Sequence, residues 1–472
     1  MSGQRAFDAG TPRLRLALPL LLLVGILLAL VRRTAVPLPN PDTYFHLRFG
    51  REFLAGWSPS DPGSVSSFAT ADWRPTQWLS QVVMAAGERT FGLPGVAWLS
   101  GLLLLALTFA LYVATRRRAD PIAAVPVTAL ALIACGPALG MRPQVLSFVL
   151  SVVVVSAWLR AQDDHRVRWW LVPATWLWAM LHGMWPLALV IGGCAVLGMA
   201  LDGGLPRRRL AAHAAVPLLS AAAAFLTPVG PGLVGAVVGV GSRREFFVEW
   251  GPPSLLTPAG LGFAVLFAAL LASELRGPRT PAGRILWILL ALALAAYSAR
   301  TLPLAALLIA PLTAAALQQQ LPVRRPPGRG EQAVVGTSFA GSLLLLAFLV
   351  PHTSADPPGQ PDWMDPALGS LPAGTPVLNE TVSGGYLMWR FPQLDLVMHG
   401  YGDTFTIPEL RRNARILTLE PGWRDLVAET GARYAVLDPE TPLAHALVRS
   451  EGWQVLHRSA EVELLGAPGV AR

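Results

Sequence analysis

Long apolar runs, separated by short polar connections, dominate the chain from residue 14 to residue 351. About 20 consecutive apolar residues are needed for a helix to cross the hydrocarbon core of a bilayer. The pattern therefore predicts an α-helical polytopic membrane protein with about eleven transmembrane helices, at residues 14–31, 96–115, 121–139, 145–159, 169–182, 185–202, 210–226, 257–274, 285–299, 301–318 and 335–351.

Two parts of the chain break this pattern. Residues 32–95 are polar and aromatic, and they contain two short amphipathic pieces, Thr43–Leu54 and Thr76–Arg89. Residues 352–472 have the composition of a soluble domain. There the pattern predicts helices at Ile407–Leu419, Trp423–Gly431 and Leu443–Glu451, and strands at Thr375–Leu378, Tyr386–Phe391, Leu394–His399, Arg433–Leu437 and a pair within Trp453–Leu465. Such alternation predicts a small α/β domain. We therefore expect a transmembrane domain at 1–351, with a first external loop at 32–95, and a second domain at 352–472.

Arginines orient the predicted helices. If the N-terminus is cytoplasmic, every predicted inside loop carries a cluster, as the positive-inside rule requires: Arg116–Arg118; Arg160, Arg166 and Arg168; Arg207–Arg209; Arg276, Arg279 and Arg284; Arg324, Arg325 and Arg329. An odd number of crossings places the C-terminal domain outside the cytoplasm. We therefore expect a multi-pass plasma-membrane protein with a cytoplasmic N-terminus and an extracytoplasmic C-terminal domain.

Composition agrees with a membrane location. The chain is 53% hydrophobic and only 14% charged, and its net charge of +8 comes from arginine alone among the basic residues. These arginines lie in short clusters between apolar runs, where they set orientation, so we expect no nucleic-acid partner. The two cysteines, Cys135 and Cys194, stand alone in apolar runs, which favours packed thiols over a disulfide or a metal site.

Candidate chemistry begins just after the first apolar run, with Asp42. A carboxylate there can act as general base on a hydroxyl, or it can simply cap a helix or lie at the membrane interface. His46 lies four residues later and would share a helix face with Asp42. This pair is a weak metal signal. We expect no cofactor, while a divalent metal remains possible.

Other polar residues recur in the first loop and at the ends of apolar runs predicted to lie outside. Arginine there suits a phosphate, because its planar fork makes two charge-assisted bonds, but it can also be a snorkelling interfacial residue. A lone histidine at a helix end can likewise be structural. Ionisable groups gathered on one side of a membrane are typical of an embedded site. The substrate-binding candidates are His46, Asp72, Gln77, Trp78, Arg142, Gln144, His182, Glu249 and Arg300.

Several of these residues belong to motifs with a family resemblance. The first loop opens with a D-x-W-W-H-L-x-x-G-like stretch and continues with D-P-x-S-x-x-S-F and W-L-S; R-P-Q, H-G, E-W and R-x-x-P follow at the ends of apolar runs. These motifs lie at Asp42–Gly50, Asp61–Phe68, Trp78–Ser80, Arg142–Gln144, His182–Gly183, Glu249–Trp250 and Arg300–Pro303, with a further one at Val377–Trp389. The chain resembles the GT-C superfamily of membrane glycosyltransferases, and within it a set of bacterial membrane proteins with this opening loop.

The resemblance implies roles for individual residues. In GT-C enzymes the first-loop aspartate is thought to activate the acceptor, and the donor is commonly a polyprenyl-phosphate sugar. Asp42 would then be the base, with Arg142 and Arg300 binding the departing lipid phosphate. The chain departs from the pattern where Tyr44 and Phe45 replace tryptophans, and where His399–Asp403 replaces D-G-R-x-D. The second departure leaves the role of the C-terminal domain open.

The leading hypothesis is an integral-membrane glycosyltransferase on the external face. It would move a hexosyl or pentosyl group from a lipid-linked donor to a glycan, lipid or protein acceptor, with membrane lipids as its surroundings. The alternative is a non-catalytic transporter or an assembly subunit of a cell-envelope system. Transport favours ionisable groups in the middle of membrane spans, whereas here they lie at the ends of apolar runs, which counts against a transporter. The assembly-subunit alternative stays open.

Overall fold

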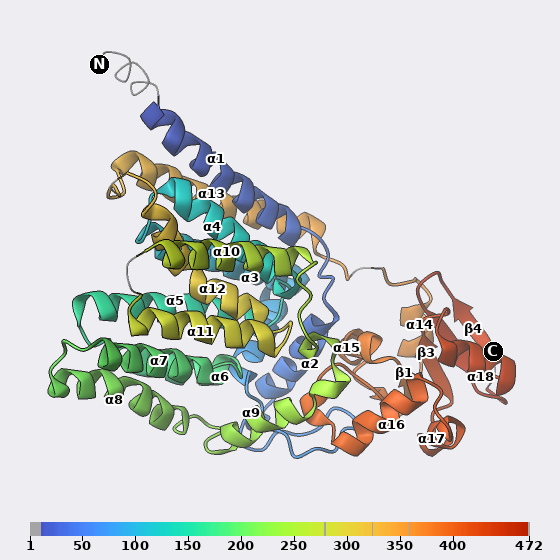
Figure 1. Ribbon diagram of the computed structural model, residues 1–472. Helices are drawn as coiled ribbons and strands as arrows, with labels where there is room; N and C mark the ends of the chain where they lie inside the picture. Colours follow the sequence, from blue (N-terminus) through green and yellow to red (C-terminus); the bar gives the residue numbers. More distant parts are fainter. Residues whose placement is uncertain (1–10, 278–279, 323, 358, 471–472) are drawn as a thin grey trace, which may run out of the picture. The chain divides into compact units, whose positions relative to one another are not determined.

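The computed structural model describes residues 11–277, 280–322, 324–357 and 359–470 (Figure 1). The chain divides into two compact units. Unit 1 comprises Met1–Val36, Ala97–Thr227 and Val248–Ala355, and unit 2 comprises Pro37–Val96, Pro228–Phe247 and Asp356–Arg472. Most of the predicted cytoplasmic N-terminal tail lies outside the described residues.

Unit 1 is a bundle of apolar helices. Each apolar run predicted from the sequence coincides with one helix: α1 (Thr11–Thr34), the later part of α3 (Trp78–Arg116), α4 (Pro121–Cys135), α5 (Gln144–Asp164), α6 (Leu171–Leu181), α7 (Pro186–Asp202), α8 (Arg207–Ala224), α10 (Pro258–Arg276), α11 (Ala282–Tyr297), α12 (Leu302–Gln318) and α13 (Arg329–Thr353). Among the described helices, six are long and apolar enough to cross a membrane, and α6, α7, α11 and α12 are shorter apolar helices. The chain is a multi-pass membrane protein.

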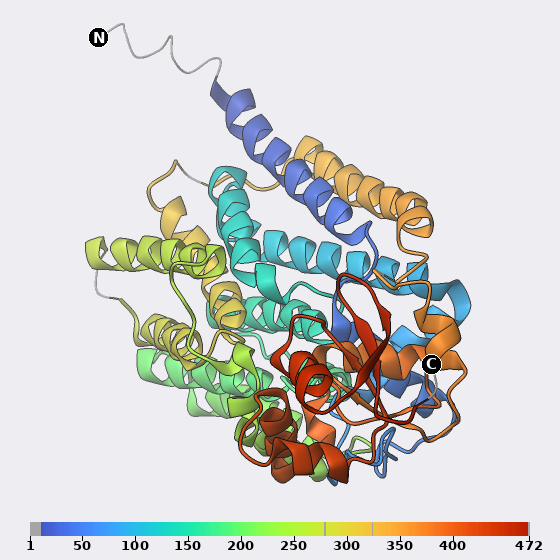
Figure 2. The same ribbon diagram turned by 90° about the vertical axis from the view of Figure 1, so that its right-hand side faces the viewer.

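Helix α12 forms the centre of the bundle. Nearly all of its side chains are buried, and it packs against α4, α5, α10 and α11. Its Thr313 hydroxyl donates a hydrogen bond of 3.2 Å to the Leu266 carbonyl of α10, which satisfies a polar group that would otherwise be buried alone. Helix α1 instead lies alongside α13 at the edge of the unit (Figure 2). The central position of α12 explains why nearly all of its residues are apolar.

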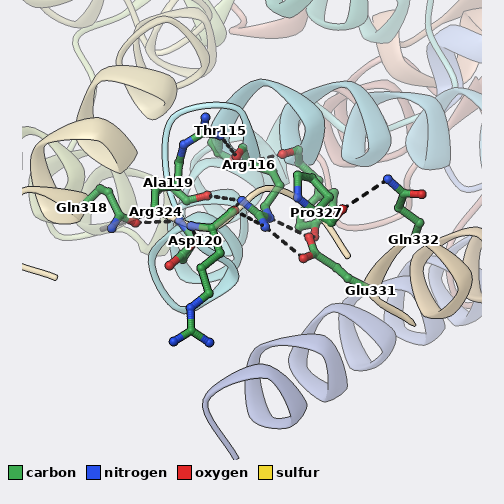
Figure 3. Close-up of polar contacts among 11 residues, drawn as sticks. Thr115, Arg116, Ala119, Asp120, Gln318, Arg324, Pro327, Glu331 and Gln332 are labelled. Atoms are coloured by element: carbon green, nitrogen blue, oxygen red, sulfur yellow. Dashed lines mark hydrogen bonds and ion pairs between the residues drawn. The ribbon is translucent and has the colours of Figure 1, made fainter. Parts of the chain in front are cut away.

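A buried ion pair joins the end of α3 to the start of α13 (Figure 3). The Arg116 guanidinium donates to both carboxylate oxygens of Glu331, at 2.6 and 2.9 Å, and also to the backbone carbonyls of Ala119 and Arg325. Tyr112 donates its hydroxyl proton to the same carboxylate at 2.9 Å. Because Arg116 and Glu331 are each only 5% exposed, each charge depends on the other for its solvation.

Unit 2 contains the first loop, whose helices follow local sequence signals. The Asn40 side chain caps α2 (Pro41–Leu54) by accepting from the Asp42 backbone N–H at 2.9 Å, and proline at the first helical position suits that start. The first part of α3 also belongs here. It breaks at Gly92, whose φ of 67° is open to glycine and strained for other residues, just before Pro94. The break separates the predicted amphipathic piece from the following apolar run.

The C-terminal part of unit 2 is an α/β structure, as predicted. Strands β1 (Pro376–Asn379), β2 (Asp395–Leu396), β3 (Tyr434–Leu437), β4 (Gln454–Arg458) and β5 (Glu463–Gly466) form a sheet in the order β2-β1-β3-β5-β4, parallel among the first three and antiparallel at β5 and β4. Its helices are α14 (Met364–Gly369), α15 (Thr381–Arg390), α16 (Ile407–Leu417), α17 (Trp423–Glu429) and α18 (Pro442–Ser450). The Thr406 and Glu409 side chains form a capping box that starts α16.

Two local predictions were wrong. The expected strand at Tyr386–Phe391 lies mostly in α15, where the residues from Gly384 to Trp389 are all buried, so no alternation separates strand from helix. Glycine permits that burial: a Cβ on Gly384 would lie 2.3 Å from the Met398 carbonyl oxygen, and one on Gly385 would lie 2.5 Å from that of Pro41. The second correction concerns residues 227–256, which connect the predicted helices at 210–226 and 257–274 and were expected to form a loop: this connection contains the helix α9 (Gly232–Ser242).

Candidate functional site

Asp42 lies in the first turn of α2, in unit 2. Asn40 rather than Asp42 caps the helix, so the capping alternative does not account for this carboxylate. The side chain is partly exposed and points toward Gly400 in the C-terminal part. A Cβ built on Gly400 would lie 3.4 Å from the Asp42 Oδ1 atom, an ordinary van der Waals distance. The backbone at Gly400 therefore lies beside the carboxylate.

His46 is on the same helix, four residues after Asp42, as predicted for a helical segment. It is only 3% exposed. The Gln81 amide nitrogen donates to its Nδ1 atom at 3.1 Å, so the ring carries its proton on Nε2. Across the described ranges, no group of three or more His, Cys, Asp and Glu side chains is close enough to hold a metal ion. His46 is held as a neutral, oriented imidazole.

Tyr401 fills the space beside α2. Its ring stacks on Phe45, with ring centroids 5.2 Å apart, and meets Phe49 and Trp73 edge-on. Burial raises the pKa of Tyr401 far above its ordinary value, and the Asp403 carboxylate acts in the same direction. The phenol is therefore a neutral group at any physiological pH, and it can donate a hydrogen bond but does not act as a base.

The neighbouring His399 is also buried and neutral, because burial lowers its pKa to about 3. Its Nδ1 atom accepts from the Tyr401 backbone N–H at 3.3 Å. No role was predicted for His399 or Tyr401 from the sequence. The available signal was the difference from the resembled motif at His399–Asp403, a segment that the structure places next to Asp42.

The remaining candidates of the first loop, Gln77, Trp78 and Asp72, lie in different surroundings. The Gln77 amide lies near Tyr401 and opposes the rise in its pKa, so Gln77 belongs to the same surroundings. Trp78 is partly buried, and its indole N–H has no hydrogen-bond partner among the residues that the structure describes. Asp72 differs, because its side chain is 81% exposed and is paired with Arg74 at 2.6 Å. A solvated ion pair of this kind is the ordinary surface arrangement.

A clasp formed by Arg51, Glu88 and Trp389, which the sequence did not reveal, fixes α2 within unit 2. Arg51 donates to both carboxylate oxygens of Glu88 on α3, at 3.0 and 2.5 Å, and its NH1 group donates to the Trp389 carbonyl at 3.2 Å. The Trp389 indole N–H donates to the same carboxylate at 2.6 Å. A lone acidic residue in an otherwise apolar amphipathic piece was the available signal. The clasp ties α2, α3 and α15 together, and so positions the helix that carries Asp42.

In unit 1, Glu249 brings two predicted arginines together. The Arg300 guanidinium donates to its Oε1 atom, and Arg142 donates to its Oε2 atom at 3.4 Å. The backbone supports this geometry, because the Arg300 N–H donates to the Glu249 carbonyl at 3.0 Å. The Arg300 guanidinium also lies over the Trp250 ring, 5.2 Å from its centroid. Two cations are thus directed at one anionic group, at the ends of apolar helices.

Gln144 begins α5, two residues after Arg142. It is 2% exposed, and neither atom of its amide has a hydrogen-bond partner within the described part of the chain. A buried amide left unpaired costs roughly 1–3 kcal/mol. This position is therefore one where a polar ligand or a water would stabilise the protein.

His182 follows α6 directly and is 5% exposed. The Trp178 indole N–H donates to the Ser147 hydroxyl at 2.7 Å, and that hydroxyl lies 2.9 Å from His182 Nδ1. The Met184 backbone N–H also points at Nδ1, at 3.4 Å. Both contacts make Nδ1 an acceptor, so the proton is on Nε2. The arrangement orients the ring and leaves Nε2 as its donor atom.

Comparison with known proteins identifies structures that have a similar fold. No protein-family model and no curated protein matches the chain. Among solved structures, ArnT from Cupriavidus metallidurans bound to undecaprenyl phosphate is 18% identical, with a TM-score of 0.54 over 94% of this chain and 97% of that one. The apo oligosaccharyltransferase of Archaeoglobus fulgidus is 12% identical, with a TM-score of 0.54 over 92% of this chain and 70% of that one.

Both are GT-C glycosyltransferases. The chain has a GT-C-like fold. At these identities the likeness concerns the fold alone, and it confirms the predicted class: an α-helical membrane protein with a small C-terminal α/β part. The same fold can host different functions, so the chemistry depends on the residues of this chain.

Proposed function

We propose that the chain is an integral-membrane glycosyltransferase. It moves a sugar from a polyprenyl-phosphate donor to a hydroxyl or amide of a glycan, lipid or protein acceptor, on the external face. The observation that carries this proposal is the Arg142–Glu249–Arg300 cluster. In a GT-C-like membrane protein, two guanidinium groups directed at one carboxylate form a binding site that a lipid phosphate can occupy, and we call this site the phosphate seat.

The proposed reaction assigns one task to each group. For a hydroxyl acceptor, Asp42 takes the proton as the acceptor oxygen forms a bond to the anomeric carbon of the sugar. The bond between that carbon and the phosphate oxygen breaks, and its electron pair leaves with the polyprenyl phosphate. Arg142 and Arg300 stabilise the charge that develops on this leaving group. Gln144 and the His182 Nε2–H supply further donors for polar ligand atoms.

The phosphate role predicts a loss of binding when either arginine is removed. We expect Arg142→Ala and Arg300→Ala each to raise the Kd for polyprenyl phosphate by roughly 10- to 100-fold, since each substitution removes charge-assisted hydrogen bonds. The measurement is a binding titration of purified, detergent-solubilised protein with polyprenyl phosphate and with polyprenyl-phosphate sugars.

Arg244→Ala is the matched control, because Arg244 is an exposed arginine that lies five residues before Glu249. Its Kd should stay within about twofold of the unmodified value, as surface charges contribute little. Equal weakening by all three substitutions, or no saturable binding to folded unmodified protein, contradicts the phosphate seat and favours a non-catalytic subunit.

Substitution of Glu249 is expected to change the Kd for polyprenyl phosphate in the opposite direction. In the absence of donor its carboxylate holds both guanidinium groups, so an arriving phosphate must displace it. We expect Glu249→Gln to tighten polyprenyl phosphate binding by roughly tenfold, because the competing charge is gone. The same titration measures the change.

Glu245→Gln serves as the comparison here, since Glu245 is exposed and pairs with Arg411 instead. It should leave the Kd unchanged. Weaker binding by Glu249→Gln would mean that the carboxylate mainly holds the two arginines in position, and would rule out displacement.

A further inference from the structure

Unit 1 has a second group of arginines at the other end of α5. Gln144 begins this helix and Arg160 lies sixteen residues later, so the two ends are separated by about 24 Å at 1.5 Å per residue. That distance approaches the thickness of the hydrocarbon core, about 30 Å. The Arg160 end is therefore at the opposite membrane face from the Arg142–Glu249–Arg300 cluster, and it is a separate place for an anion.

A cavity of about 210 Å³ lies at this end, between α3, α5 and α12. Ala114, Leu159 and Pro311 line it with apolar surface, and we call it the arginine cavity because Arg117, Arg118 and Arg160 line it as well. It is smaller than the roughly 300–1,000 Å³ that encloses a drug-sized ligand. Its size suits a headgroup, with an acyl chain continuing along the apolar helix surface.

The charges of the arginine cavity are not balanced by its own residues. Asp163 is the acidic residue in its lining, and it pairs with Arg118 at 2.7 Å. Within 11–277, 280–322, 324–357 and 359–470, the Arg117 side chain forms no hydrogen bond or ion pair. Arg160 donates its Nε–H to the Ser156 carbonyl at 3.3 Å. Three arginines and one aspartate leave two positive charges around one small space.

The neighbours of the cavity compensate only in part. Arg117 and Arg168 act on Arg160 as like charges, and the opposing carboxylate, Asp164, is itself paired with Arg168 at 2.5 Å. A bound anion would relieve this repulsion, and a phosphate oxygen pair matches the fork of a guanidinium group. Basic pockets between transmembrane helices at the cytoplasmic side are typical binding places for anionic lipid headgroups.

We infer that the arginine cavity binds the phosphate headgroup of an anionic membrane phospholipid, with the acyl chain on its apolar lining. This site is independent of the proposed donor site at the other face. The single negative charge of the lipid phosphate offsets part of the positive charge of Arg117 and Arg160, and the headgroup fills the space between the ends of α3 and α5, so the lipid stabilises the bundle.

The test is a lipid titration followed by native mass spectrometry and by the melting temperature. Purified protein is titrated with phosphatidylglycerol, with zwitterionic phosphatidylcholine, and with phosphatidylglycerol in the presence of excess inorganic phosphate. We expect saturable binding of phosphatidylglycerol with a rise in Tm, no such binding of phosphatidylcholine, and little competition by inorganic phosphate. Competition by inorganic phosphate at equal strength would assign the cavity to a free anion and overturn the lipid.

Variants test the residues. Arg117→Gln with Arg160→Gln should weaken phosphatidylglycerol binding by roughly tenfold or more, and Arg117→Gln alone, at an exposed position, should weaken it to a smaller extent. Arg166→Gln is the matched control, since Arg166 is an exposed arginine just after the end of α5 that does not line the cavity. Equal effects of the control and the double variant, or no effect of either cavity variant, would overturn the proposal. Because no variant touches the Arg142–Glu249–Arg300 cluster, polyprenyl phosphate binding reports separately on the proposed function.

Discussion

We expect Asp42→Asn to lower the rate of sugar transfer by roughly 10²- to 10⁴-fold, the usual contribution of a positioned general base. Asparagine keeps the size and the hydrogen-bonding shape of the side chain but cannot take up the acceptor's proton. The Asn40 cap and the burial of Tyr44, Phe45 and His46 hold α2 in place, so the substitution leaves the helix intact. The measurement is transfer of labelled sugar from a polyprenyl-phosphate donor, at matched protein amounts.

Asp61→Asn is the control for this experiment. Asp61 is an exposed carboxylate of the same loop, and its substitution should leave the transfer rate within about twofold, as for other surface positions. Transfer retained by Asp42→Asn would remove Asp42 as the base. Unchanged donor binding together with lost transfer would locate the defect in chemistry rather than in the phosphate seat.

The largest expected effect on stability comes from Glu331→Gln. The substitution removes the main counter-ion of the buried Arg116 charge and leaves only the partly exposed Asp120 carboxylate, 3.7 Å away. Breaking a buried pair in this way costs about 3–5 kcal/mol. The Arg116 contacts to the carbonyls of Ala119 and Arg325 remain, and they hold the guanidinium where it is least solvated. Equilibrium unfolding in mixed detergent micelles measures the change in the free energy of unfolding.

Two comparisons make this result specific. Replacing both partners, as in Arg116→Met with Glu331→Leu, should recover most of the lost stability, because no charge is then left buried. Gln332→Ala changes the exposed neighbour of Glu331 and should cost less than about 0.5 kcal/mol. A loss below about 1 kcal/mol for Glu331→Gln would show that water reaches the pair.

The position of Asp42 gives the C-terminal part a structural role that its sequence left open. The Tyr401 ring of the segment His399–Asp403 stacks on Phe45, and its Gly400 approaches Asp42. The Arg51–Glu88–Trp389 clasp holds the same helix, α2, through Arg51. The proposed base therefore depends on residues more than three hundred positions away.

Elements with local signals could be predicted from the amino-acid sequence alone. Apolar runs of near-bilayer length located the helices of unit 1, because burial in lipid requires a continuous apolar surface. A proline and a capping side chain begin α2, and short apolar runs located β1 and β3. The shared face of Asp42 and His46 was expected on the condition that their segment is helical, and the structure has that segment in α2.

Only the tertiary structure decided which distant groups meet. Glu249 contacts Arg142 across 107 positions and Arg300 across 51, and no spacing rule predicts such contacts. The helix α15 was missed because every residue from Gly384 to Trp389 is buried, which removes the polar face that reveals a helix. The pattern of apolar residues along one element indicates which side of that element is buried. Ion pairs such as Arg116–Glu331 arise instead from packing between elements. There, desolvation makes each charge depend on a partner that is far away in the chain.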